Sequence, residues 1–104
     1  MKEIKKFKDL INEKKFYEAH EALENIWFPI RKKKNDCALV LKGFINGAVS
    51  MELFKRGKIE QSKNVHKNYL KYVISNKINK TKNKERFIEL KSFMDKKFKN
   101  TFKN

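Results

Sequence analysis

Apolar residues recur every three or four positions in several separate windows of the chain, which is the periodicity of amphipathic helices. This spacing predicts helices over residues 3–12, 15–30, 36–56, 59–76 and 84–99. No window alternates between apolar and polar positions as a half-buried strand would. The pattern therefore predicts an all-α fold, a single compact bundle of about five helices.

The helix predicted over residues 36–56 is apolar around most of its circumference. A helix of this kind is buried on all sides, so we expect it at the centre of the bundle. Asn35-Asp36 is a candidate N-cap at its start. Gly43 and Gly47, one turn apart, form a smooth strip on which a neighbouring helix can pack closely.

The remaining pattern predicts how the chain is organised. With 104 residues, the chain is long enough for one domain with its own core, and we expect one helical domain over residues 1–104. Residues 76–84 contain a single apolar side chain, Ile78, and are predicted to be an exposed linker. A basic C-terminal helix over residues 84–99 follows this linker.

Several observations favour a cytoplasmic protein that has no membrane partner. The N-terminal residues are charged and lack the apolar core of a signal peptide. The longest apolar stretch, residues 37–54, is interrupted by Lys42, Asn46 and Glu52, so it is expected to be a buried helix rather than a membrane span. Cys37 is the only cysteine, which excludes an internal disulfide and a cysteine-based zinc site.

The formal net charge is +15, and its distribution along the chain is uneven. Residues 1–30 are neutral, so the whole excess of positive charge lies in residues 31–104. A basic surface can attract nucleic acid. However, only three of the 27 basic residues are arginine, the side chain that recognises phosphates and bases in bidentate fashion. Abundant Lys and Asn are also typical of an AT-rich genome, which we favour as the main cause of the charge.

The most informative segment lies within the helix predicted over residues 15–30. At about 100° per residue, His20, Glu24 and Trp27 fall on one side of this helix, beside its apolar stripe. A histidine and a carboxylate in such a position form either a buried polar network or a chemical site. In the network, His20 donates to Glu24 or to Asn46 of the central helix, while Lys42 neutralises a carboxylate, either Glu24 or its neighbour Glu21.

In the chemical site, the same residues have different roles. His20 and Glu24 are the candidate metal ligands, and Glu21 is the candidate acid–base group, so the catalytic candidates are His20, Glu21 and Glu24. Two ligands do not hold a metal tightly, and Glu24 stands where a zinc-protease motif has its second histidine. We favour the network, and we expect no cofactor.

A resemblance to a known family rests on this segment and on the central helix. Phe16 to Glu24 reads FYEAHEALE and is followed by Trp27, and Leu41 to Ala48 reads LKGFINGA. The two segments resemble the small prokaryotic family known as domain of unknown function 309, whose pattern is EAHExLExxW. The resemblance covers roughly residues 10–75. It implies a compact all-α bundle and no assigned activity.

Three functions remain open from the sequence. The leading hypothesis is a non-enzymatic cytosolic scaffold or interaction module that binds a second copy of itself or another protein. The first alternative is a metal-assisted or acid–base enzyme centred on His20, Glu21 and Glu24. The second is a weak, non-specific nucleic-acid-binding accessory protein, in which Tyr69 and Tyr72 would stack bases between lysines.

Overall fold

The computed structural model of the protein describes residues 2–33 and 35–102. Over these residues the chain forms six α-helices, one 3-10 helix and no strand. In chain order they are α1 (Lys2–Asn12), α2 (Phe16–Trp27), the 3-10 helix η1 (Phe28–Lys33), α3 (Asp36–Lys55), α4 (Ile59–Tyr72), α5 (Ser75–Ile78) and α6 (Lys84–Thr101). The predicted all-α bundle is confirmed.

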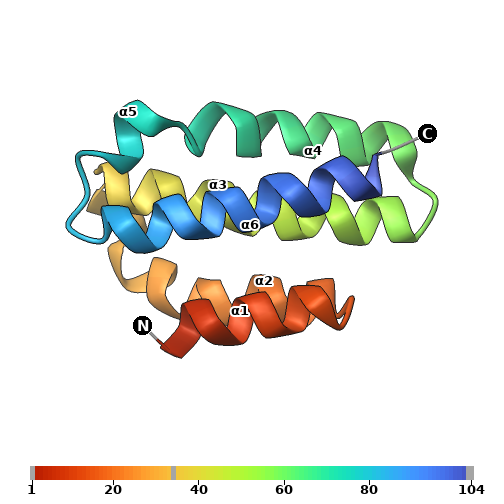
Figure 1. The fold of residues 1–104 in the computed structure, drawn as a ribbon, viewed down its shortest axis with the longest axis horizontal. Coiled ribbons are helices and arrows are strands. Elements are labelled where there is room, and N and C mark those ends of the chain that lie inside the picture. The colour runs from red at the N-terminus through yellow and green to blue at the C-terminus, as the bar shows by residue number, and fades with distance from the viewer. Residues whose placement is uncertain (1, 34, 103–104) are drawn as a thin grey trace.

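Helix α3 lies at the centre of this bundle. It packs against α2, η1, α4, α5 and α6, while α1 packs against α2 and α6. Figure 1 shows α6 lying across the front of α3, and α1 lying in front of α2. The side chain of Asn35 caps α3, because its Oδ1 accepts a hydrogen bond of 2.9 Å from the backbone N–H of Ala38.

The core is built from side chains of all the longer helices. Each fully buried large apolar side chain stabilises the fold by roughly 1.5–3 kcal/mol. They include Phe7 of α1, Leu23 of α2, Phe44 and Met51 of α3, Tyr69 of α4, and Phe87 and Met94 of α6.

The two interior glycines of α3 allow neighbouring helices to pack closely against it. A Cβ atom added to Gly43 would lie 2.6 Å from Val73 Cγ2 and 2.9 Å from Tyr72 Cβ. At Gly47 the nearest atoms all belong to side chains, and they lie at 3.0 Å or more. Gly57, at φ +80, provides the left-handed turn that brings α4 back along α3.

The α-helix predicted over residues 15–30 ends earlier than expected, at Trp27. Pro29 has no N–H to donate back along an α-helix, and its ring crowds the preceding turn. The chain therefore tightens into the 3-10 helix η1 rather than continuing α2.

The segment predicted as an exposed linker is partly ordered, so that prediction is wrong in part. Residues 75–78 form the short helix α5, and Ile78 is completely buried between α5, α3 and α6. The preceding helix ends at Tyr72 rather than at residue 76. At the other end, α6 continues to Thr101, two residues beyond its predicted end, and Phe102 stacks on Phe98.

Helix α3 is the one described helix that is long and apolar enough to cross a membrane. However, 56% of its most apolar window is buried inside the bundle. This combination is typical of the core helix of a soluble protein.

Candidate functional site

The His20–Glu24 pair forms as the spacing predicts, along one side of α2. His20 Nε2 lies 3.2 Å from Glu24 Oε2, and the two residues are one helical turn apart. The side chain of His20 is 18% exposed and that of Glu24 is 40% exposed. The carboxylate therefore remains in contact with water, while the imidazole is mostly enclosed.

The second ring nitrogen of His20 is the unusual feature of this pair. His20 Nδ1 is buried and has no hydrogen-bond partner among the described residues. When Nε2–H donates to Glu24, a neutral ring keeps an unused lone pair on Nδ1. The ring of Tyr17 lies close by, with its centroid 5.5 Å from that of His20. A buried polar atom left unpaired costs stability, so this nitrogen is a place where a ligand atom would gain a bond.

The other two candidates on α2 do not join this arrangement. Glu21 is exposed and lines a shallow pocket of about 410 Å³ together with Glu24, Asn25, Phe28 and Pro29, which does not include His20. Trp27 is half-buried and packs against the hydrophobic core. Over residues 2–33 and 35–102, no three His, Cys, Asp or Glu side chains converge in a way that could hold a metal ion.

The two α3 candidates have partners of their own. Asn46 Nδ2 donates to the carbonyl oxygen of Lys42, at 2.8 Å. Lys42 Nζ lies 5.7 Å from the centre of the Tyr72 ring on α4. Among the described residues, no hydrogen bond or ion pair joins Lys42 or Asn46 to α2.

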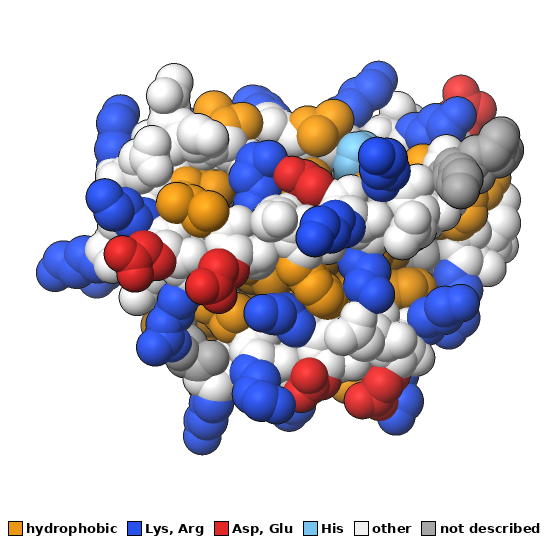
Figure 2. Space-filling model, viewed as in Figure 1, with side chains coloured by type: hydrophobic (Ala, Val, Ile, Leu, Met, Phe, Trp, Pro, Cys, Tyr) orange, Lys and Arg blue, Asp and Glu red, His pale blue; other side chains and the backbone are white. Residues whose placement is uncertain are grey.

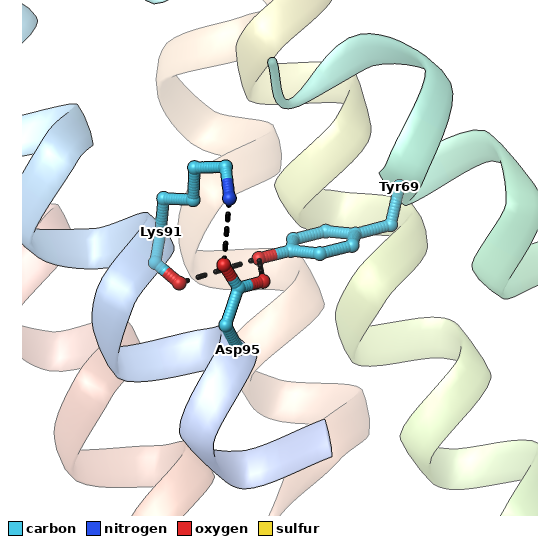
Figure 3. A network of polar contacts seen from close by, with 3 residues as sticks. All are labelled: Tyr69, Lys91 and Asp95. Atoms are coloured by element: carbon cyan, nitrogen blue, oxygen red, sulfur yellow. Dashed lines mark hydrogen bonds and ion pairs between the residues drawn. The ribbon is translucent and has the colours of Figure 1, made fainter. Parts of the chain in front are cut away.

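A polar network that the sequence analysis missed joins α4 to α6 (Figure 3). Tyr69 Oη donates to Asp95 Oδ1 at 2.7 Å, and Lys91 Nζ donates to Asp95 Oδ2 at 2.6 Å. Burial, and then the bond to Asp95, raise the pKa of the Tyr69 hydroxyl well above its usual range. The i,i+4 spacing of Lys91 and Asp95 was visible in the sequence, but their link to α4 was not.

His66 borders the same network and is enclosed by aromatic rings. It stacks on Tyr69, with ring centroids 5.6 Å apart, and its centroid lies 4.2 Å from that of Phe98. Burial lowers the pKa of His66, although the charge of Asp95 acts in the opposite direction. His66 is therefore a neutral side chain packed among aromatic rings at the edge of the core, where its role is structural.

On the face of the molecule that Figure 2 shows, the basic side chains do not form one concentrated patch. Figure 2 shows Lys and Arg spread over the whole visible face, with acidic side chains among them. Tyr69 is only 1% exposed, so it cannot stack on a base. Tyr72 is half-buried, and the ammonium groups of Lys42 and Lys71 lie 5.7 and 5.3 Å from the centre of its ring.

The fold and the motif together define a small all-helical bundle that carries a His–Glu pair on its second helix. The sequence model of the family described as domain of unknown function (DUF309) matches residues 4–65 of the chain. The chain therefore belongs to the DUF309 family. The match runs from α1 into α4 and leaves α5 and α6 outside it. No curated protein and no solved structure matches the chain.

Proposed function

We propose that this protein is a non-enzymatic, cytoplasmic interaction module whose binding surface is the outer side of α2 and α3, and that its partner is a second copy of the chain. The observation that carries this proposal is an apolar stripe on α3 that the bundle leaves partly uncovered.

The stripe consists of α3 positions that the neighbouring helices do not fully bury. Gly43, Gly47 and Ser50 face α4, and Phe44 faces α6. Five half-exposed or exposed positions of the helix lie along one line, at an angle to the positions that face α4 and α6. They are Leu39, Lys42, Asn46, Val49 and Leu53.

The spacing of this stripe matches a helix–helix seam. Its members follow one another at intervals of three and four residues, as the a and d positions of a coiled coil do. Leu39, Val49 and Leu53 supply the apolar contacts. Asn46 lies at the middle of the stripe, and a single amide at a core position is a known determinant of register and oligomeric state.

Charge favours a second copy as the partner. The chain carries +15, so most of its surface repels another copy. Helix α2 contains no Lys or Arg, and Lys42 is the one basic residue of the stripe. Interface cores are depleted of lysine, which fits this side of the molecule. Lys42 of one copy and the exposed carboxylates Glu21 and Glu24 of the other are complementary.

Oligomeric state tests the proposal. We expect the wild-type protein to dimerise reversibly in sedimentation velocity over a concentration series. Val49→Glu places a charge in the seam, so it should raise the dissociation constant of the dimer by tenfold or more. This change corresponds to a loss of binding free energy on the order of 1.4 kcal/mol or more. Helical circular dichroism should remain, since Val49 is only half-buried.

Ile88→Glu is the matched control for this experiment. Ile88 is 49% exposed on α6, away from the stripe, and the substitution makes the same change in charge. It should leave the dimer constant unchanged. A wild-type protein that stays monomeric at all concentrations would overturn the proposal, as would equal effects of the two substitutions.

A second candidate function, a metal site, rests on the approach of His20 Nε2 to Glu24 Oε2 at 3.2 Å. If His20 and Glu24 bind a metal, Zn²⁺ or Mn²⁺ will raise the melting temperature of the wild type and not that of His20→Ala. Under the interaction-module proposal, we expect no metal-dependent shift in either protein.

Stability of His20→Ala gives a separate readout. The substitution removes a mostly enclosed ring and its bond to Glu24, so the free energy of unfolding should fall by about 1 kcal/mol. The loss should not be larger, because Glu24 is 40% exposed and water replaces its lost partner. Urea denaturation measures this change. A His20→Ala protein that is more stable than wild type would indicate a group held in place for chemistry rather than for the fold.

A further inference from the structure

A pocket of about 420 Å³ lies at one end of the bundle, separate from the outer side of α2 and α3. It is formed where the turn between α1 and α2 meets the last turns of α3 and α6. Figure 1 shows these three parts of the chain together at the end of the bundle opposite α5. Its volume is within the range of small-molecule sites.

The inner wall of this pocket is apolar. Ile11 and Met51 are almost fully buried and close its base. Phe16 and Phe54 are half-buried and form its sides. An apolar lining of this kind gains stability by covering an aliphatic or aromatic group.

The rim of the pocket is cationic. Lys14, Lys55 and Lys97 line it, and its lining contains no Asp or Glu. The ammonium group of Lys55 is held in place, because it donates to the carbonyl oxygen of Lys14 at 3.2 Å. It also lies 5.9 Å from the centre of the Phe16 ring, at the boundary between the rim and the apolar wall.

We propose that this pocket binds an amphipathic monoanion, a medium-chain aliphatic carboxylate. The tail covers Met51 and Phe54, and the carboxylate reaches the ammonium group of Lys55. An aliphatic cation is repelled by the three lysines, and an aliphatic alcohol leaves their charge uncompensated. A polyanion such as a nucleotide would pair with the lysines of the rim but would leave the apolar base of the pocket uncovered.

Isothermal titration calorimetry with decanoate, below its micelle concentration, tests the proposal. We expect one decanoate to bind per chain, and decanol and decyltrimethylammonium to bind at least tenfold more weakly. Lys55→Glu should weaken decanoate binding by tenfold or more, and Lys55→Gln should weaken it by a smaller factor. Because Lys55 is exposed, both variants are expected to fold.

Lys99→Glu is the control for the strongly basic surface. Lys99 is exposed near the end of α6, is not part of this pocket, and gives the same change in net charge. It should leave decanoate binding unchanged. Binding of several decanoate molecules per chain with equal losses in Lys55→Glu and Lys99→Glu would show general adsorption to a basic protein and overturn the proposal. Absence of binding, or equal binding of decanol, would also overturn it.

Discussion

Replacing Gly43 with leucine should either prevent the chain from folding or lower the free energy of unfolding by about 2–4 kcal/mol. Even the first atom of the new side chain has no room, because it would lie 2.6 Å from Val73 Cγ2 and 2.9 Å from Tyr72 Cβ. Val73 N is 3.3 Å away, so the backbone at the C-terminal end of α4 would also have to move. Urea denaturation followed by circular dichroism measures the loss.

Two further substitutions show whether close helix packing is the cause. Gly43→Ala should cost more than Gly47→Ala, although both gain helix propensity. The new Cβ at position 43 would lie within 3 Å of two atoms, whereas the neighbours of Gly47 are side-chain atoms at 3.0 Å or more. Lys80→Leu, at an exposed position, should change stability little. A Gly43→Leu protein as stable as wild type would mean that α3 and α4 do not meet at this strip.

Much of the helical architecture could be predicted from the sequence, because the apolar residues of each long helix recur with the helical period. The central position of α3 followed from its apolar circumference, and Asn35 caps it as expected. The exceptions are local. A lone apolar residue in a polar segment has no period, so the buried Ile78 and helix α5 could not be recognised.

In the candidate site, contacts within one helix could be predicted, and contacts between helices could not. The His20–Glu24 pair lies within one helix, so its spacing alone predicts the 3.2 Å contact. The partners of Lys42 depend on how two helices are placed relative to each other, and a single sequence does not specify this. Lys42 lies over Tyr72 of α4 rather than beside a carboxylate of α2. For the same reason the bond from Tyr69 to Asp95 was not predicted.

The second large effect is expected at Tyr69. Tyr69→Ala should lower the free energy of unfolding by about 3–5 kcal/mol, the usual range for removing a large aromatic side chain from a core. The ring is 1% exposed and contacts three others, with centroids 4.8 Å from Phe98, 5.6 Å from His66 and 6.0 Å from Phe44. Chemical denaturation of the two proteins provides the measurement.

Tyr69→Phe separates the ring from its hydroxyl group. This variant keeps the aromatic contacts and loses the 2.7 Å bond to Asp95, which retains Lys91 and is 42% exposed to water. The expected cost is therefore only about 0.5–1.5 kcal/mol. Equal losses in Tyr69→Ala and Tyr69→Phe would show that the hydroxyl group, rather than the packed ring, carries the stability.

The pH dependence of the same pair gives an independent check on the Tyr69 hydroxyl. Its pKa is raised by folding above the ordinary value of 10.0, chiefly by burial and then by the bond to Asp95. Above pH 10 the unfolded chain therefore loses this proton while the folded protein keeps it, and the stability contributed by the protonated hydroxyl declines. The stability advantage of wild type over Tyr69→Phe should accordingly shrink between about pH 9 and 11, in a range where the many lysines titrate equally in both proteins. An advantage that stays constant or grows with pH would contradict a buried, hydrogen-bonded hydroxyl group at this position.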